Sequence, residues 1–284
     1  MDDPNFTIGI VGGMGKMGQW FARFFENAGH RVIITGRKTE VSTMDLPEMC
    51  DAIFLSVPLA PAVELAGQLG PKMREGQLLS DFCSLKADIT HAMGASAKAD
   101  VVGTHPLFGP RTASLAGQNV VLCHSRGDTW LPRLERLFTE HGAVVTKSEP
   151  EEHDRMMSVV QGMNHFVTVA LGRAVQRMGI PAEDLARFST PLFRLRMNTV
   201  GRLFAQDLWL FEDLIEKNPG VPEILDHFEK AVAETKDAFS QKAAARLMEE
   251  VREHWRNMLE PSLAESEACL TFLTGAGSRG EDAY

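Results

Sequence analysis

The chain has 284 residues, which is long enough for two domains or for one large one. Its content of 44% hydrophobic and 24% charged residues is ordinary for a soluble globular protein. The formal net charge of −9 argues against a nucleic-acid partner, because phosphate binding requires a basic face. No apolar run approaches the ~20 residues that span a bilayer, so we expect no membrane partner either.

The cysteines and the N-terminus indicate in which cellular compartment the protein is expected. Residues 1–4 are acidic and lack the apolar segment of a secretory signal. The four cysteines are scattered without a CxxC pair, so we predict neither a disulfide framework nor a metal site. Reduced thiols are typical of a cytoplasmic protein, and this is the location we expect. The cysteines are Cys50, Cys83, Cys123 and Cys269.

A glycine motif stands near the start of the chain. The apolar run 8–11 leads into Gly13-x-Gly15-x-x-Gly18, and residues 19–28 then show helical periodicity. Strand, tight turn and helix in this order indicate dinucleotide binding; the alternative is a glycine-rich turn in another α/β domain. We expect Gly13 to permit the turn, Gly15 to admit a pyrophosphate, and Gly18 to let helix and strand pack closely. The predicted cofactor-binding loop comprises Gly13, Met14, Gly15, Lys16, Met17 and Gly18.

The first half of the chain alternates strand-like and helix-like stretches. This alternation is typical of βαβ units with a mostly parallel sheet, in which ligands bind at the carboxyl ends of the strands. The further predicted strands are 31–35, 52–57, 77–82, 101–104, 119–123 and 143–146, and the predicted helices are 59–69, 86–97 and a helix capped by Asp128 that ends at Glu140.

The second half shows only helical periodicity. A helix is expected to begin near Pro150, and breaks are expected at 179–181 and 218–220. We therefore predict an α/β Rossmann-type nucleotide-binding domain over 1–149, followed by an all-helical domain over 150–274 for substrate and dimer contacts. The predicted later helices are 193–217, 222–239 and 241–272, and residues 275–284 are expected to form a disordered tail.

The end of the second predicted strand bears on the choice of cofactor. In this fold an acidic residue there binds the ribose 2′-OH of NAD, whereas an arginine accommodates the 2′-phosphate of NADP. Here Gly36, Arg37 and Lys38 follow the strand, and the first carboxylate is Glu40. Gly36 has no side chain to repel a phosphate, and Arg37 offers a bidentate fork. We predict a preference for NADP over NAD; the alternative is that Arg37 and Lys38 are solvated loop charges.

Three polar clusters follow predicted strands, at the edge where ligands bind. The first, 56–58, is expected beside the nicotinamide, and the second is 81–86. The third, 104–110, contains His105, which the rigid Pro106 would hold at the mouth of the sheet. A histidine there suits general acid–base catalysis, the alternative being a capped structural histidine. The cofactor contacts predicted in the first cluster are Ser56, Val57 and Pro58.

Polar residues also recur at helical spacing in the second half. Gln161 and His165 are expected to share one helix face, as are Arg202 and Gln206. Arg194 and Arg202 form a basic stripe in an otherwise apolar stretch, which could be a solvated helix face. The neighbours of Arg202 look core-facing, however, and a partly buried arginine needs an anion such as a substrate carboxylate.

Taken together, these segments resemble the prephenate dehydrogenase family of tyrosine biosynthesis. The similarity is closest to the dehydrogenase domain of the bifunctional chorismate mutase/prephenate dehydrogenases. The strings HPLFGP and VGRLFAQD are far more specific than the glycine motif. The matching segments are 11–18, 84–86, 104–110, Glu152-His153-Asp154 and 200–207, in order across nearly the whole chain.

The resemblance implies roles at the matched positions. It makes His105 the catalytic histidine that hydrogen-bonds the ring hydroxyl of the substrate. It makes Arg202 a ligand of a substrate carboxylate, and it places the catalytic residue Ser84 near that hydroxyl and the nicotinamide. The closest NAD-using relatives have an acidic residue where this chain has Gly36, in agreement with NADP. The residues that line or support the substrate site would be Gln206, Arg194, His165 and Lys86.

The implied function is oxidative decarboxylation of prephenate, a cyclohexadienyl carboxylate, to 4-hydroxyphenylpyruvate by a homodimer joined through the helical domain. Arogenate or 4-amino-4-deoxyprephenate as substrate stays open, because the side-chain pocket cannot be assigned. A β-hydroxyacid dehydrogenase typically needs a lysine in its helical domain, and residues 171–215 contain none. A non-catalytic NADP-sensing dimer would have no need of His105 and Arg202.

Overall fold

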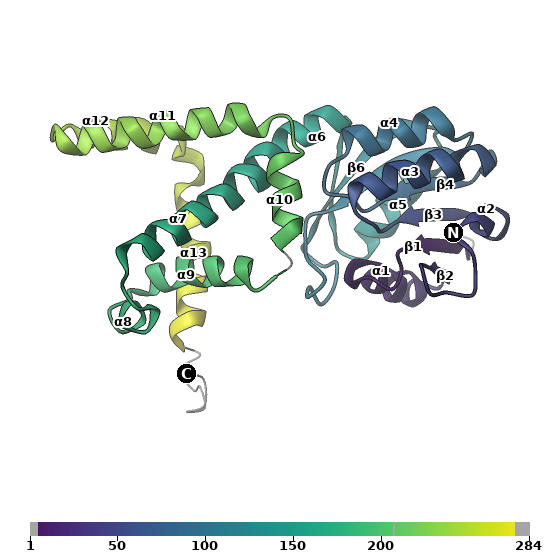
Figure 1. Ribbon diagram of the computed structural model, residues 1–284, viewed down its shortest axis with the longest axis horizontal. Helices are drawn as coiled ribbons and strands as arrows, with labels where there is room; N and C mark the ends of the chain where they lie inside the picture. The colour runs from purple at the N-terminus through teal and green to yellow at the C-terminus, as the bar shows by residue number, and fades with distance from the viewer. Residues whose placement is uncertain (1–4, 207, 276–284) are drawn as a thin grey trace. The chain divides into compact units, whose positions relative to one another are not determined.

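The computed structural model describes residues 5–206 and 208–275, and the chain divides into two compact units, Met1–Met157 and Ser158–Tyr284. We describe each unit by itself (Figure 1). The division lies one helix later than the boundary predicted between residues 149 and 150. The helix between the two positions, α6 (Pro150–Met157), packs against α4 and β6 of the first unit.

The first unit is built on a seven-stranded sheet with the order β2-β1-β3-β4-β5-β6-β7. All neighbouring pairs are parallel except β5 and β6. No helix lies in the connection 107–118, so the chain turns back instead of crossing over. The mostly parallel α/β sheet is confirmed. The strands are β1 (Thr7–Val11), β2 (Arg31–Thr35), β3 (Ala52–Leu55), β4 (Leu78–Asp81), β5 (Asp100–Pro106), β6 (Asn119–Arg126) and β7 (Val144–Ser148).

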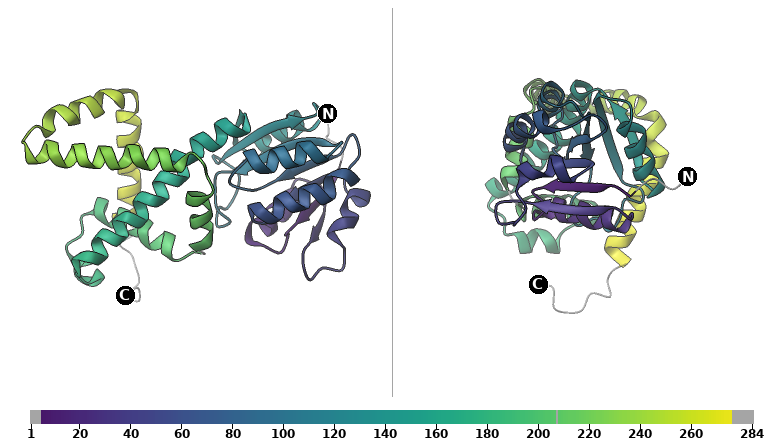
Figure 2. Two further views of the ribbon diagram at one scale, coloured as in Figure 1. Left: turned by 45° about the horizontal axis from the view of Figure 1, so that its top comes forward. Right: turned by 90° about the vertical axis from the view of Figure 1, so that its right-hand side faces the viewer.

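Helices cover both faces of this sheet (Figure 2). Alternate strand residues point to opposite faces. Ile10 and Phe54 therefore join a cluster with α1 and α5, while Val11 and Leu55 join a second cluster with α2, α3 and α4. Both faces are thus buried, as parallel sheets require. These helices are α1 (Lys16–Asn27), α2 (Leu46–Met49), α3 (Leu59–Leu69), α4 (Ala87–Ser96) and α5 (Trp130–Glu140).

The prediction of the N-cap residue of α5 is wrong. Asp128 was predicted to cap this helix, but its N-cap residue is Thr129, which makes no side-chain cap hydrogen bond. Asp100, at the start of β5, accepts instead from the backbone N–H groups of Thr129 and Trp130 at 2.8 and 2.9 Å. A carboxylate distant in sequence thus takes the place of a local cap.

The glycine loop also differs from the expectation in one respect. The residue with a positive φ is Gly12, at +78°, and not Gly13. Gly13 is needed for space, since a Cβ there would lie 2.5 Å from Ile34. A Cβ on Gly18 would lie 2.5 Å from the Gly12 carbonyl oxygen, in keeping with its expected packing role.

The second unit is helical and begins with a π-helical turn, Ser158–Met163. The break expected near residue 179 is present, because Gly179 ends α7 with a φ of +67°. No helix among the described residues is long and apolar enough to cross a membrane. The helices are α7 (Asn164–Met178), α8 (Ala182–Arg187), α9 (Pro191–Phe204), α10 (Leu208–Glu216), α11 (Val221–Ser240), α12 (Ala244–His254) and α13 (Leu259–Gly275).

Two long helices predicted in this unit are each broken. The helix expected over 193–217 is α9 and α10, and the helix expected over 241–272 is α12 and α13, separated by the 3-10 turn Arg256–Met258. Apolar spacing continues across both breaks, so periodicity alone did not reveal them. Of the tail predicted over 275–284, Gly275 ends α13, and 276–284 lie outside the described residues.

The packing of the glycine loop leads to a stability prediction. Gly18→Ala places a methyl group 2.5 Å from the Gly12 oxygen and 2.7 Å from the Gly13 Cα, and backbone atoms cannot move aside cheaply. We expect a loss of about 1–3 kcal/mol in the free energy of unfolding, measured by urea denaturation. Gly67→Ala in α3 is the control, because nothing lies within 4 Å of its Cβ position. The control is expected to stabilise by about 0.5–1 kcal/mol. Equal stability of the two variants would contradict the packing described here.

Candidate active site

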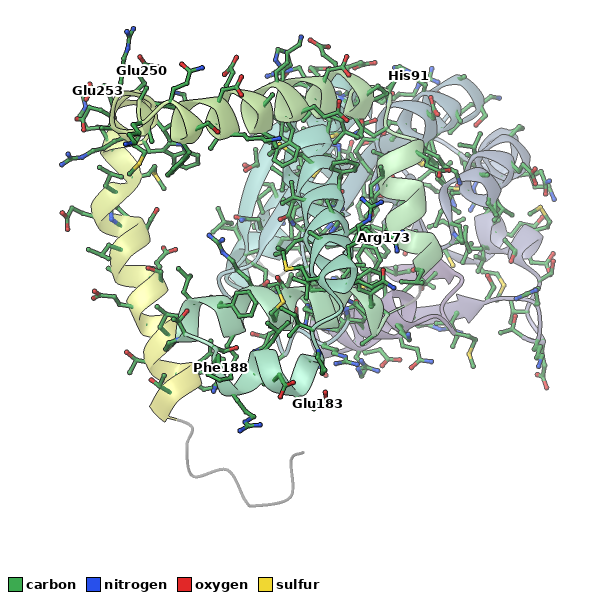
Figure 3. All side chains as sticks on the ribbon, turned by 60° about the vertical axis from the view of Figure 1, so that its left-hand side comes forward. His91, Arg173, Glu183, Phe188, Glu250 and Glu253 are labelled. Carbon is green, nitrogen blue, oxygen red and sulfur yellow. The ribbon has the colours of Figure 1, made fainter. Side chains whose placement is uncertain are left out.

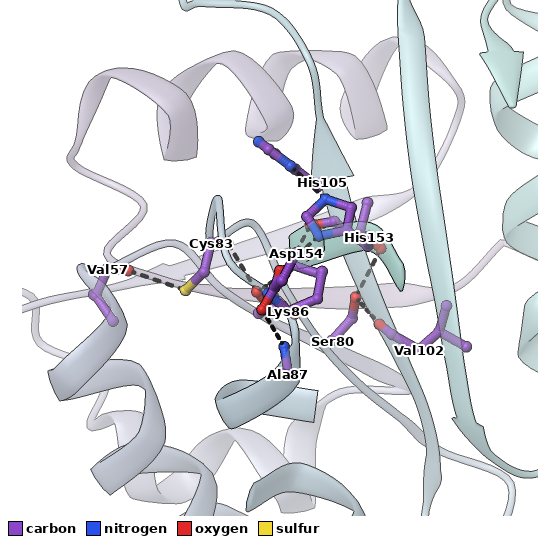
Figure 4. A network of polar contacts seen from close by, with 11 residues as sticks. Val57, Ser80, Cys83, Lys86, Ala87, Val102, His105, His153 and Asp154 are labelled. Carbon is purple, nitrogen blue, oxygen red and sulfur yellow. Dashed lines mark hydrogen bonds and ion pairs between the residues drawn. The ribbon is translucent and has the colours of Figure 1, made fainter. Parts of the chain in front are cut away.

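A cluster of buried polar side chains lies at the carboxyl ends of β4 and β5 (Figure 4). It draws residues from two strands, from the turn before α4 and from α6. The most exposed member, Asp154, is only 6% exposed. Buried polar groups need partners, so their contacts define the site. The members are Asp81, Lys86, Thr104, His105, His153 and Asp154.

Three of these residues form what we call the histidine network: His105, His153 and Asp154. The His105 Nδ1 lies 2.8 Å from the His153 Nε2, and the His153 Nδ1 lies 2.7 Å from the Asp154 Oδ1. The two rings meet edge to face, with centroids 5.0 Å apart. Each histidine therefore has one nitrogen committed to the next member of the network.

Asp154 also caps a helix. Lys86, the N-cap residue of α4, makes no side-chain cap hydrogen bond of its own. The carboxylate of Asp154 accepts instead from the backbone N–H groups of Lys86 and Ala87, at 2.7 and 2.9 Å. A carboxylate interacts favourably with the N-terminus of a helix, so Asp154 supplies the cap that the Lys86 side chain does not.

A buried ion pair supports the same turn. The Lys86 ammonium contacts the Asp81 Oδ2, and both side chains are fully buried. The ammonium also lies 3.3 Å from the Thr104 carbonyl oxygen. Gly103 leaves room for the lysine, since a Cβ there would come within 3.1 Å of its Cδ. Lys86 was predicted to line or support the substrate site. In the structure its ammonium is buried and paired with the Asp81 carboxylate.

Burial and charge act together on His105, which is 3% exposed. Burial lowers the pKa of His105 well below the usual imidazole value, because it penalises the charged ring. The nearby Lys86 ammonium lowers this pKa further. His105 is therefore a neutral imidazole at physiological pH and can accept a proton.

The glycine loop offers a cradle for an anion. Gly15, the N-cap of α1, makes no side-chain cap hydrogen bond, and the first turn of α1 contains no acidic residue. The end of β2 is tied to this loop, because the Thr35 carbonyl accepts from Gly12 and Gly13 at 2.8 and 3.2 Å. The loop and helix terminus thus fit a pyrophosphate group.

The two other predicted cofactor segments lie beside the loop. The Ser56 backbone N–H donates to the Val11 oxygen at 2.8 Å, and its carbonyl oxygen would lie 2.4 Å from a Cβ on Gly12. Beyond β2, Arg37 and Lys38 are exposed, and nothing lies within 4 Å of a Cβ on Gly36. The space at Gly36 is therefore open, at the position where the fold binds the adenosine ribose.

The turn after β4 contains Ser84, which is half-buried. Next to it, the backbone N–H of Cys83 donates to the Asp81 Oδ2 at 2.8 Å, so the ion-paired carboxylate also fixes this turn. Burial raises the pKa of the Cys83 thiol well above its usual value. This thiol is therefore a packing group and not a nucleophile.

The predicted site residues of the second unit have varied surroundings. His165 is half-buried edge-on against Phe211, with centroids 4.8 Å apart, and burial lowers its pKa. Arg194 donates to the Leu273 carbonyl oxygen. Arg202 was expected to be partly buried, but it is exposed in the single chain.

The expected pairing of Arg202 with Gln206 on one helix face also needs correction. Helix α9 ends at Phe204, so Gln206 lies beyond it. The Gln206 amide nevertheless donates to the Arg202 carbonyl oxygen at 2.9 Å. The two residues therefore stay together through a side-chain contact.

Sequence reasoning gave no role to His153, Asp154 or Asp81. His153 and Asp154 appeared only within a matching segment, and Asp81 only within a polar cluster. An acidic residue in the first turns of a helix is favourable to the dipole of that helix, so the sequence gives no separate sign that Asp154 caps α4. Its partners, Lys86 and Ala87, are far away in the sequence. Among the described residues, no group of three or more potential metal ligands gathers.

The fold and the site together define a Rossmann-type dinucleotide-binding domain with a buried histidine network, followed by a helical domain. Residues 21–147 match the nucleotide-binding domain of prephenate dehydrogenase, and residues 149–253 match its dimerization domain. The chain belongs to the prephenate dehydrogenase family. The match begins after the glycine motif, so the loop is an independent sign of nucleotide binding.

Individual relatives agree with this family. The chain is 29% identical to the probable arogenate/prephenate dehydrogenase of Methanocaldococcus jannaschii, over 96% of this chain and 66% of that protein. It is 34% identical to the T-protein of Haemophilus influenzae, over 73% of this chain and 55% of that protein. The chain thus spans 66% and 55% of the length of these two relatives.

A solved structure shows the same fold. Prephenate dehydrogenase from A. aeolicus, in complex with hydroxyphenyl propionate and NAD+, aligns with a TM-score of 0.74 at 23% identity. The alignment covers 91% of this chain and 98% of that one. The predicted order of a nucleotide-binding domain and a helical domain is therefore confirmed.

The buried ion pair leads to a second stability prediction. Lys86→Met leaves the Asp81 carboxylate buried without its cation, and we expect a loss of about 3–5 kcal/mol in the free energy of unfolding. In the double variant Asp81→Asn/Lys86→Met no charge remains buried, so more than half of this loss should be recovered. Urea denaturation of both variants measures the difference. Equal losses in the single and double variants would show that the pair is not the dominant interaction of Lys86.

Proposed function

We propose that this chain catalyses the oxidative decarboxylation of prephenate to 4-hydroxyphenylpyruvate, with NADP preferred over NAD. The observation that carries the proposal is His105, a buried and neutral imidazole at the carboxyl edge of a nucleotide-binding sheet. Membership of the prephenate dehydrogenase family supports the same reaction. A relative named for both arogenate and prephenate is consistent with either substrate.

The cofactor would be held by residues of the first unit. The glycine loop and the N-terminus of α1 would bind the pyrophosphate, and residues 56–58 would lie beside the nicotinamide. The exposed guanidinium of Arg37, with no side chain at Gly36, would accept the 2′-phosphate of NADP. The predicted loop contacts remain Gly13, Met14, Gly15, Lys16, Met17 and Gly18.

The reaction requires one proton acceptor from the protein. A nicotinamide bound by the first unit would supply the acceptor for the hydride that leaves C4 of the substrate ring. His105 takes up the proton of the C4 hydroxyl as the hydride leaves. After the ring carboxylate has left as CO₂, His105 returns this proton to the oxygen, which becomes the phenol hydroxyl. The electron pair of the broken carbon–carbon bond completes the aromatic ring. A general base of this kind contributes roughly 10²–10⁴-fold to the rate.

Substrate binding is assigned to residues with suitable charge and exposure. Arg202 has an exposed guanidinium that would bind a substrate carboxylate, and Gln206 would be kept near it by the hydrogen bond between them. Ser84 would hydrogen-bond near the C4 hydroxyl. Lys86 would act indirectly, by fixing the turn that contains Ser84. Arg194 and His165 remain candidates for lining the substrate site.

The assembly we propose is a homodimer joined through the helical unit. The family match over residues 149–253 is named for dimerization. Large apolar side chains are exposed in this unit when the chain is considered alone; Phe188 is 86% exposed (Figure 3). A cavity of about 800 Å³ lies among α7, α8, α9 and α13. Burying such surface would favour association.

The test is the initial rate of nicotinamide reduction with prephenate, measured in parallel with NADP and NAD. We expect turnover to favour NADP. In the matched variant His105→Asn, kcat should fall by about 10²–10⁴-fold with little change in KM, because the base is lost while the binding groups remain. Near-full turnover of His105→Asn would exclude its proposed role.

The other outcomes separate the remaining alternatives. A preference for NAD would keep the reaction and reject the assignment of Gly36 and Arg37. Turnover with arogenate or 4-amino-4-deoxyprephenate, and not with prephenate, would change the substrate alone. Nucleotide binding without turnover of any of the three would favour a non-catalytic NADP sensor.

A further inference from the structure

We propose that His153 and Asp154 are positioning residues that hold His105 in one tautomer, with its Nδ1 protonated and its Nε2 unprotonated. The catalytic importance of this tautomer rests on the proposed function, but the tautomer itself does not. The two nitrogens of a histidine are distinct, and the hydrogen bond made by one decides whether the other bears a proton. In the histidine network, the tautomer of His105 is determined by the residue at the opposite end, Asp154.

The far end is the Asp154 carboxylate, which can only accept. Two backbone N–H groups, those of Lys86 and Ala87, point at its oxygens at 2.7 and 2.9 Å. Backbone N–H groups are obligatory donors, so both oxygens are used as acceptors. The third neighbour, the His153 Nδ1 at 2.7 Å, must therefore bear a hydrogen and donate it.

This first bond determines the second. We assign His153 a single proton, on Nδ1, which leaves its lone pair on Nε2. That lone pair lies 2.8 Å from the His105 Nδ1, so the His105 Nδ1 must be the donor. Because the pKa of His105 is lowered, its ring holds one proton and not two. The Nε2 of His105 is then the unprotonated nitrogen, which is the atom needed to take a proton from a substrate hydroxyl.

The same network suits the protonated form of His105 during turnover. Once its Nε2 has taken up a proton, the ring is a cation that donates through Nδ1 to His153. His153 in turn donates to the negative charge of Asp154. This is the role that a buried aspartate has behind the histidine of a hydrolase triad, where it orients the ring and stabilises the imidazolium. Here a second imidazole is interposed.

Three parts of the first unit place charged or titratable side chains near His105. Helix α6 contributes His153 and Asp154, and the turn before α4 contributes Lys86. The end of β4 contributes Asp81, which compensates the ammonium of Lys86. Removing the Asp154 carboxylate would therefore leave the His153 Nδ1 without this acceptor.

A purely structural interpretation predicts a different behaviour. If Asp154 only capped α4 and His153 only filled space, variants at these positions would change stability but not the tautomer of His105. The two interpretations separate at His153, which makes no contact with the α4 backbone among its hydrogen bonds in the described structure.

The test uses two substitutions of different length at one position. His153→Gln can place its amide oxygen near the site of Nε2 and still accept from His105. His153→Asn is too short and keeps only the end near Asp154. His91→Asn is the control, because His91 is an exposed surface residue paired with Glu151.

The first measurement is ¹⁵N NMR of the imidazole nitrogens in the whole protein without substrate. The signals of His105 are assigned from their absence in His105→Asn. We expect Nδ1 to be protonated and Nε2 unprotonated in the native protein, in His153→Gln and in His91→Asn. In His153→Asn the signals should shift toward a mixture of tautomers. A native His105 protonated on Nε2 would overturn the proposal, whatever the substrate of the enzyme.

The second measurement is the pH dependence of kcat with prephenate, together with the melting temperature. We expect His153→Asn to lower kcat by about 10²-fold at an unchanged KM, and His153→Gln to stay within about tenfold of the native rate. A loss of stability in His153→Asn with the native tautomer and pH profile would reduce the network to a structural role. Absence of turnover by the native protein would reject the proposed function, but the NMR result would still decide whether His105 has the proposed tautomer.

Discussion

The structure depends on one buried carboxylate. Asp154 receives two backbone N–H groups from the start of α4 and one imidazole N–H from His153. A buried charge is tolerated only when it is well paired, and these contacts together with the dipole of α4 meet that requirement. They also explain why α6 packs with the first unit although the strand and helix alternation has already ended. The carboxylate thus connects the architecture of the unit with the chemistry of His105.

The glycine loop imposes a second constraint, which is steric. The loop has no room for a side chain at Gly12, Gly13 or Gly18. A Cβ at each position would collide with backbone atoms or with Ile34. The end of β2 is held against this loop by the hydrogen bonds from Gly12 and Gly13 to the Thr35 carbonyl oxygen, and Arg37 follows two residues later. The proposed pyrophosphate and ribose subsites would therefore depend on the same contacts.

Much of this arrangement could be predicted from the sequence, because the relevant signals are local. The alternation of strands and helices, the glycine spacing and the position of His105 at the carboxyl end of β5 each follow from a few neighbouring residues. The capping contacts could not be predicted in this way. Asp100 caps α5 and Asp154 caps α4 from positions distant in sequence, and only the fold brings them together. The burial of Arg202 was misjudged for a related reason, since apolar neighbours do not show which face of a helix is covered within one chain.

The central claim is that His105 is a neutral, buried base, and the pH dependence of kcat/KM for the native enzyme with prephenate tests it most directly. This ratio reports the pKa of the essential base in the free enzyme. Since burial and the nearby Lys86 ammonium lower the pKa of His105, activity should persist below pH 6.5 and fall only at lower pH, as the ring becomes protonated. An acid limb with an apparent pKa at or above 6.5 would contradict the account, because the base would then be an exposed or differently placed group.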